Sequence, residues 1–286
     1  MNSWQVGDVK ISCVVEFKSA AVYDPDRGII IGATPEAVRQ IPWLAPRYIS
    51  PDGHLLMAVQ AVLVEAPGLK LLVDTCIGND KPRRMTRGIG LKTGFLQRLA
   101  SAGWNRDDVS AVVCTHLHID HVGWNTMRQN DRWVPTFPRA RYLMARREYE
   151  FWAQDKEDDE QIDAMSDSVQ PLFDAGLVDL VDSDHALSDE VRLLPSPGHT
   201  PGHVCVAIES KGEKAVITGD MMHHPCQIAR PDLLARFDTD HAVALATRRR
   251  LLAEWADQPV LVVGTHFVSP AGGYVRSDAT AYRFES

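Results

Sequence analysis

The sequence lacks any apolar run long enough to cross a membrane, and its first residues show neither the basic start nor the apolar centre of a signal peptide. It holds only 5 cysteines in 286 residues, an odd number scattered through apolar stretches. This distribution is typical of reduced thiols and argues against a disulfide framework. These absences predict a cytoplasmic protein that does not bind membranes.

Basic residues are in the minority, since 30 Lys and Arg against 38 Asp and Glu give a formal net charge of −8. They gather only in two short clusters, at 248–250 within a helical pattern and at Lys81, Arg83, Arg84 and Arg87 within a loop-like stretch. We expect both clusters to be exposed to solvent. A nucleic-acid partner is not expected, because phosphate binding needs a broader basic surface.

No linker rich in Gly, Ser or Pro divides the chain, so we expect one domain over residues 1–286. The composition, 45% hydrophobic and 24% charged, is that of a globular protein with a sizeable core. Residues 18–53 form a long segment between two predicted strands and contain Trp43. This segment is either a lid over a site or a surface segment that buries its own aromatic side chains.

Ligand-type side chains concentrate at residues 115–123, THLHIDHVG. His116 and His118 are two positions apart, so an extended backbone points both to one side, and Asp120 and His121 follow at once. Residues 109–114 predict a buried strand, which puts these side chains at a strand's C-terminal end, where sites of α/β sheets tend to lie. Imidazole and carboxylate suit zinc and similar ions, whereas burying so many polar groups unpartnered would cost several kcal/mol. We therefore predict a metal site rather than a set of capping residues.

Later segments repeat the arrangement of an apolar strand followed by a ligand-type side chain. His199 lies in the turn GHTPGH, where Gly and Pro set a tight backbone, and Asp220 and His266 follow the runs 215–219 and 260–264. Asp74 similarly ends an earlier strand at 71–73. Taken singly, Asp74 and Asp220 are also compatible with ordinary turn residues.

Together these motifs resemble those of the metallo-β-lactamase fold superfamily, in particular its lactonase and organophosphate-hydrolase-like branch. The resemblance implies an α/β fold, a four-layer αββα sandwich in which two mixed sheets pack face to face with helices outside. It also implies two divalent metal ions, expected to be zinc, although manganese, iron and cobalt suit similar donors. The implied ligands are His116, His118, His199 and Asp220 for one ion, and Asp120, His121, His266 and Asp220 for the other, with Asp74 and His203 supporting them from behind.

The resemblance further implies metal-dependent hydrolysis by a hydroxide that bridges the ions, because a bound metal lowers the pKa of water from about 15.7 toward about 7. Asp120 is expected to take up a proton as the intermediate collapses. In the lactonase branch a tyrosine soon after the bridging aspartate helps to hold the substrate carbonyl. This sequence has His223 and His224 there instead. Either one replaces the tyrosine as a catalytic donor, or the pair is structural.

The expected substrate is a small apolar ester, with a lactone as the first choice. A phosphotriester or arylester hydrolase on the same site is the alternative. A β-lactamase usually lacks an aspartate at position 220, and a non-catalytic scaffold would be expected to have lost ligands, so both are disfavoured. Exposed aromatics in the 18–53 segment suit a homodimer. The pocket is expected to be edged by Trp43, Met221, Met222 and Phe267.

Overall fold

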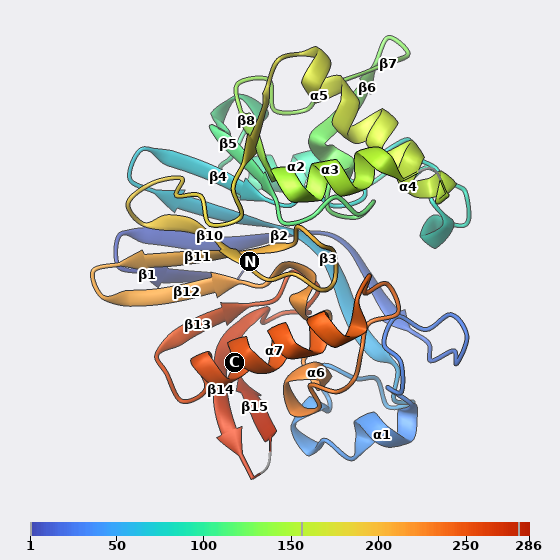
Figure 1. The fold of residues 1–286 in the computed structure, drawn as a ribbon, viewed down its shortest axis with the longest axis vertical. Helices are drawn as coiled ribbons and strands as arrows, with labels where there is room; N and C mark the ends of the chain where they lie inside the picture. Colours follow the sequence, from blue (N-terminus) through green and yellow to red (C-terminus); the bar gives the residue numbers. More distant parts are fainter. Residues whose placement is uncertain (1, 156, 280) are drawn as a thin grey trace.

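The computed structural model describes residues 2–155, 157–279 and 281–286, and it shows two mixed β-sheets packed face to face with helices on the outside (Figure 1). The predicted αββα sandwich is therefore confirmed. The first sheet has the strand order β1-β2-β3-β4-β5-β8-β9 and the second runs in sequence from β10 to β15. The strands are β1 Ser3–Val6, β2 Val9–Ala21, β3 Leu55–Ala66, β4 Leu69–Val73, β5 Ala111–Cys114, β8 Arg141–Ala145 and β9 Val178–Val181, then β10 Val191–Pro195, β11 Val204–Ser210, β12 Glu213–Ile217, β13 Val260–Val263, β14 Gly272–Asp278 and β15 Ala281–Glu285.

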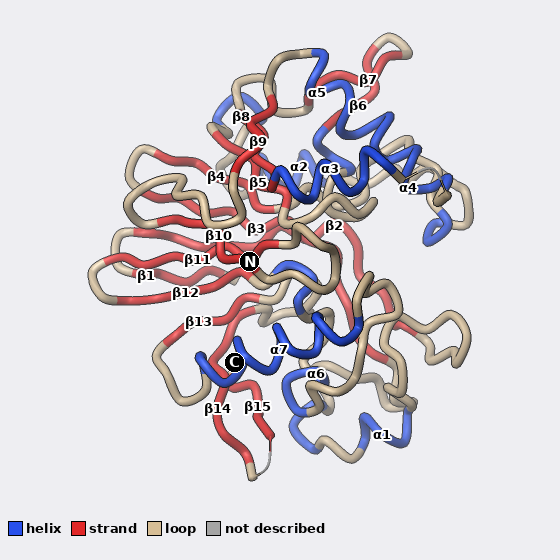
Figure 2. The backbone as a smooth tube through the Cα atoms, viewed as in Figure 1, coloured by secondary structure: helices blue, strands red, loops and turns tan. Residues whose placement is uncertain are grey.

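Helices cover the outer faces of both sheets (Figure 2). Helices α2 to α5 lie over the first sheet, and α7 lies over the second. A π-helical turn at Met165–Val169 joins α4 to α5. The helices are α1 Pro35–Arg39, α2 Phe95–Ser101, α3 Arg146–Gln154, α4 Asp159–Ala164, α5 Gln170–Asp174, α6 Cys226–Ala229 and α7 His241–Trp255.

Alternation along the strands explains the layering. In β3, Val62 and Val64 belong to the apolar cluster that includes residues of both sheets, whereas Leu63 between them belongs to the cluster under the outer helices. Successive side chains of a strand point to opposite faces, so a strand buried on both faces is apolar throughout. In the first sheet β4, β5, β8 and β9 run parallel to one another, and in the second β12 runs parallel to β13. The C-terminal ends of these strands therefore lie at one edge of the sandwich.

Two hairpins complete the strands. The histidine motif is followed by a single 3-10 turn, Gly123–Asn125, and then by a hairpin of β6 Thr126–Gln129 and β7 Arg132–Pro135. β14 and β15 form the second hairpin, beyond His266. Among the described residues, no helix combines the length and the apolar character that crossing a bilayer requires.

The 18–53 segment packs against the chain between α6 and α7. Ile30 forms an isolated bridge with Ala235, and the Arg236 side chain donates to the carbonyl of Gly28 at 2.9 Å. Tyr48 is buried, at 2% exposure, and its hydroxyl contacts the Ser286 hydroxyl at 3.0 Å. The segment therefore buries part of its own aromatic content, and its role as a lid stays a prediction.

The expectation that both basic clusters are solvated is wrong for three side chains. Lys81 and Arg83 are buried beside Asp167, at 3.3 Å and 2.8 Å, and Lys81 also reaches the Thr126 hydroxyl at 2.7 Å. Arg248 is a buried residue of α7, and its side chain donates to the backbone carbonyl of Met221 at 3.0 Å. A buried charge is tolerated where a counter-ion and acceptors surround it, which short-range sequence patterns do not reveal.

Asp167→Asn should destabilise the fold, because it leaves two buried cations without their carboxylate. We expect the free energy of unfolding in urea to fall by about 3–5 kcal/mol. Asp174→Asn, an exposed position on the neighbouring helix α5, is the matched control and should change it by about 0.5 kcal/mol or less. Equal effects of the two substitutions would contradict the structural role of Asp167.

Candidate metal centre

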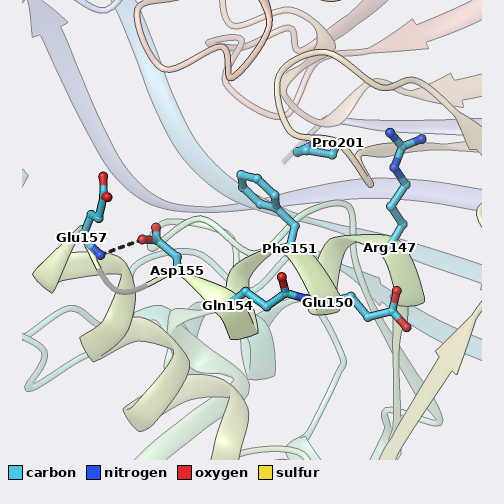
Figure 3. Close-up of a pocket in the computed structure, with 7 residues that line it drawn as sticks. All are labelled: Arg147, Glu150, Phe151, Gln154, Asp155, Glu157 and Pro201. Carbon is cyan, nitrogen blue, oxygen red and sulfur yellow. Dashed lines mark hydrogen bonds between the residues drawn. The ribbon is translucent and has the colours of Figure 1, made fainter.

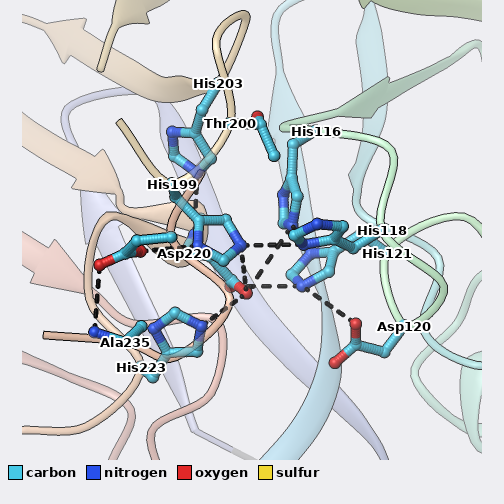
Figure 4. A network of polar contacts seen from close by, with 12 residues as sticks. His116, His118, Asp120, His121, His199, Thr200, His203, Asp220, His223 and Ala235 are labelled. Atoms are coloured by element: carbon cyan, nitrogen blue, oxygen red, sulfur yellow. Dashed lines mark hydrogen bonds and ion pairs between the residues drawn. The ribbon is translucent and has the colours of Figure 1, made fainter. Parts of the chain in front are cut away.

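All seven predicted ligands meet at one edge of the sandwich. Figure 4 labels all of them except His266. They come from loops that follow β5, β10, β12 and β13, because these strands end on the same side. The Asp120 side chain retains 19% exposure and His118 is half-buried, whereas His116, His121, His199, Asp220 and His266 are buried. The centre is therefore reached from the side of His118 and Asp120.

The first ligand group joins three imidazoles to one carboxylate oxygen. Nδ1 of His118 lies 3.0 Å from Nε2 of His116 and 2.9 Å from Nε2 of His199. Oδ2 of Asp220 lies 3.7 Å from Nε2 of His116 and 3.5 Å from Nε2 of His199. Three nitrogens thus converge on one point with a carboxylate oxygen beside them.

The second ligand group uses the other oxygen of the same carboxylate. Oδ1 of Asp220 lies 3.2 Å from Nε2 of His121 and 3.1 Å from Nε2 of His266. Asp120 lies on the outer side, with its oxygens 3.7 Å from His121 and 3.6 Å from His266. Asp220 therefore lies between the two groups and presents one oxygen to each.

In three of these imidazoles, the ring nitrogen that points away from the cluster, here called the outward nitrogen, has a hydrogen-bond partner. Nδ1 of His121 lies 2.8 Å from Oδ2 of Asp74, and Nδ1 of His266 lies 2.8 Å from the carbonyl of Ala58. Nδ1 of His199 lies 2.9 Å from Oδ1 of Asp238. Each acceptor requires a proton on the outward nitrogen, which leaves the lone pair of the inward nitrogen free for a metal.

Asp74 also reaches His116 through a hydroxyl. The Thr115 hydroxyl donates to Oδ2 of Asp74 at 2.9 Å and contacts Nδ1 of His116 at 3.1 Å. The other oxygen of Asp74 accepts from the Thr115 backbone at 2.8 Å. One buried carboxylate thus contacts an imidazole of each ligand group, directly or through Thr115, and the supporting role of Asp74 stays a prediction.

The bridging position of Asp220 is held by its backbone. Its N–H donates to Nε2 of His203 at 2.9 Å, and Nδ1 of His203 lies 2.8 Å from the Ser196 hydroxyl. Gly219 before it has φ of +52°, and a Cβ there would lie 2.6 Å from the His203 ring. The position therefore requires glycine. These contacts agree with the supporting role expected for His203.

The donor set fits a pair of divalent cations. Nδ1 of His118 lies within hydrogen-bond distance of Nε2 of His116 and of His199, yet neutral imidazoles whose protons point outward cannot donate to each other. Burial lowers the pKa of His266, but Asp220 outweighs it and raises that pKa to about 9, so the other ligand group attracts positive charge. Oδ1 of Asp220 is buried and has no hydrogen-bond donor within the described residues. Burial lowers the pKa of His118 to about 4, which keeps it neutral as a ligand must be. Cations at the two convergence points would satisfy all of these groups.

His223 is brought to the same cluster. Its Nε2 lies 3.1 Å from Oδ2 of Asp220, and its ring is stacked on His266 at an interplanar angle of 4°. Its Nδ1 is buried and has no hydrogen-bond partner in the described parts of the chain. Of the two histidines after Asp220, His223 therefore has the position expected of a substrate donor.

The structure does not bring His224 or the predicted pocket residues into the centre. Nε2 of His224 lies 2.8 Å from the carbonyl of Tyr48, and its Nδ1 accepts from the Cys226 backbone at 3.1 Å, so both ring nitrogens are engaged by backbone. The expectation that four apolar residues edge the pocket fails, because Met221, Met222 and Phe267 lie in the hydrophobic core and Trp43 lies beside the C-terminal residues 284–286.

A separate surface groove runs along the outer side of α3 and borders the turn that carries His199 (Figure 3). Phe151 points into it, with Pro201 opposite. The described residues that line it include none of the metal ligands; they are Arg147, Glu150, Phe151, Gln154, Asp155, Glu157 and Pro201.

Sequence reasoning missed three residues that support the ligands. Asp238 and Glu148 contact the ligand loops from distant segments and stand in no recognisable motif. Glu16 is placed by a bulge in β2 and accepts from the Trp124 indole and the Ile77 backbone, next to the loops after β4 and β5. Their roles depend on packing between elements, so no local pattern could have identified them.

Known proteins support the same fold and chemistry. An N-acyl homoserine lactonase from Bacillus sp. is 27% identical over 220 residues, covering 71% of this chain and 78% of that protein. One from Bacillus thuringiensis is 25% identical over 233 residues, covering 76% and 84%. The predicted enzyme class, a metal-dependent hydrolase of ester bonds, agrees with these relatives.

Solved structures match over nearly the whole chain. The hydrolase AbOPH of the beta lactamase superfamily matches with a TM-score of 0.80 at 22% identity, covering 99% of this chain and 96% of that one. AidC, described as a dizinc quorum-quenching lactonase in complex with a product, matches with a TM-score of 0.76 at 21% identity and the same coverage. The model of the metallo-beta-lactamase superfamily matches residues 55–266, which span every ligand described above. The chain belongs to the metallo-beta-lactamase superfamily.

Proposed function

We propose that the protein is a dinuclear metal hydrolase that opens a small apolar lactone, with zinc as the expected metal. The observation that carries this proposal is the position of the Asp220 carboxylate, because each of its two oxygens lies beside a different group of imidazoles. The lactonase names of the relatives at 25–27% identity support the substrate class.

Two ions bound here supply Lewis acidity and hydroxide at neutral pH. The protein's own contribution is to hold and orient. His116, His118, His199 and Asp220 would hold one ion, and Asp120, His121, His266 and Asp220 the other. Their outward hydrogen bonds keep each lone pair directed inward, so little reorganisation is needed during the reaction.

Two further side chains act on the substrate in this proposal. His223 presents an imidazole to the centre and would donate a hydrogen bond to the substrate carbonyl, in place of the tyrosine of the lactonase branch. Asp120 lies on the accessible side, where its partly exposed carboxylate would take up and release a proton. His224, Met221, Met222 and Phe267 have structural positions instead.

The alternative on the same site is an aryl ester or phosphotriester hydrolase. The observation that favours it is the absence of a tyrosine after Asp220, since residues 221–224 are Met, Met, His and His. The two candidates are separated by competition between a lactone and an aryl ester at equal concentration.

The direct test is proton release at constant pH with an N-acyl homoserine lactone, using zinc-loaded and chelator-stripped protein side by side. We expect acid release only from the loaded protein, because ring opening produces a carboxylic acid. No release from folded protein with zinc bound would contradict a lactone substrate and favour the aryl ester or phosphotriester.

Asp220→Ala should lower metal content and hydrolysis together, because both ions lose a ligand. Loss of a residue that only hydrogen-bonds a metal ligand costs up to about 100-fold in metal affinity. Because Asp220 would be a ligand itself, we expect the affinity for the more weakly bound ion and the rate of hydrolysis both to fall by more than about 100-fold. Metal analysis and proton release measure the two quantities. Full metal occupancy with an unchanged rate would exclude a bridging role.

Asp74→Asn should weaken metal binding by about 10–100-fold while leaving the fold intact, because it disturbs the orientation of His121 and, through Thr115, of His116. Chelator competition measures the affinity, and circular dichroism monitors the fold. If affinity and rate are both unaltered, Asp74 is a turn residue only.

His223→Phe should lower the rate of catalysis, whereas His224→Gln should lower the stability of the fold. Removing the His223 donor should lower kcat by about 100-fold or more with both ions retained. The His224 change should lower the free energy of unfolding by about 1–3 kcal/mol, because it disturbs buried backbone partners, with kcat per folded molecule unchanged. The reverse pattern would assign the donor role to His224.

A further inference from the structure

Glu148 is a buried carboxylate in the first turn of α3, and it lies between two ligand loops. It is not a metal ligand. Within the described residues it accepts four hydrogen bonds, three from the loops that carry His116, His118 and His199 and one from the Trp152 indole on α3.

One oxygen of Glu148 holds the loop after β5. Oε1 accepts from the backbone of Leu117 at 3.0 Å and from the Trp152 indole at 2.7 Å. Leu117 lies between the ligands His116 and His118. Its carbonyl accepts from the Gln161 side chain at 2.6 Å, so α3 and α4 fix both sides of this residue. The Trp152 ring also lies 5.2 Å from the His118 ring.

The other oxygen holds the turn after β10. Oε2 accepts from the Thr200 hydroxyl at 2.7 Å and from the Gly202 backbone at 3.0 Å. These residues directly follow His199. A Cβ on Gly202 would lie 2.2 Å from the backbone nitrogen of Glu148, so the turn packs directly on the helix. The separation between the two loops is therefore set by one carboxylate group.

The second ligand group has no contact with Glu148 among the described residues, and its partners are Asp74, which also reaches His116 through Thr115, and Ala58. His121 contacts Asp74, and its carbonyl accepts from the Thr75 backbone at 2.7 Å. His266 contacts the carbonyl of Ala58 at 2.8 Å. These contacts come from β3 and the loop after β4, which are separate from the elements that contact Glu148.

We propose that Glu148 is the positioning residue of the three-histidine half of the centre: by joining the Leu117 backbone to the Thr200–Gly202 turn, it sets the distance of His199 from His116 and His118. This inference rests on the proposed two-ion centre. It predicts a separable effect, in which loss of the carboxylate weakens one ion and leaves the other in place.

The test is Glu148→Gln, which keeps the length of the side chain but turns an NH2 group toward N–H donors that cannot accept, either those of Leu117 and Trp152 or that of Gly202 beside the Thr200 hydroxyl. We expect the affinity for one ion to fall by about 10–100-fold and the other to be unchanged. Zinc titration against a chromophoric chelator counts the ions and measures each affinity without any substrate. Glu150→Gln, an exposed position on the same helix, is the matched control and should bind both ions as wild type does.

If Glu148→Gln binds both zinc ions with unchanged affinity, the proposal is overturned. It is also overturned if the affinity for both ions falls equally in folded protein, because that result indicates a general structural role. If the variant does not fold, Thr200→Val removes one donor and keeps the carboxylate. It should weaken the same single ion by a smaller factor, and no change there would also overturn the proposal.

The readout separates this inference from the proposed substrate. A wild type that binds two ions and does not open lactones leaves the role of Glu148 intact. A wild type that binds fewer than two ions contradicts the centre itself and the role of Glu148 with it.

Discussion

The carboxylate of Asp220 lies within 3.7 Å of five imidazoles, and the rest of the site depends on this contact. A buried carboxylate is stable only beside positive charge or hydrogen-bond donors. Burial lowers the pKa of His121 and His266, but Asp220 outweighs it, raising the pKa of His121 and raising that of His266 to about 9, so this position attracts positive charge. Divalent cations at the two convergence points would supply that charge, and the two oxygens of one side chain would then set the spacing between the ions.

The sandwich supplies the rigidity that such a cluster needs. Short buried strands end at one edge, and each ligand follows a strand within a few residues. Behind the imidazoles stand buried acidic groups, Asp74, Asp238 and Glu148, each with its own set of donors. The site is therefore built as a layer of imidazoles backed by hydrogen-bonded carboxylates, an arrangement that orients the imidazole rings.

The strands that precede the candidate ligands and the family could be predicted from the sequence, because each candidate ligand stands in a short motif that follows an apolar strand. The burial of Lys81 and the packing of Met222 could not be predicted, since both depend on elements distant in the chain. His223 and His224 are adjacent and chemically identical. Only the backbone contacts of His224 with Tyr48 and Cys226 distinguish them.

The central claim is that one carboxylate joins two metal ions, and X-ray absorption spectroscopy of the zinc-loaded protein tests it most directly. The account predicts two ions per chain with a metal-to-metal distance of about 3.5–4 Å. A single ion per chain, or two ions too far apart for one carboxylate to span, would contradict it.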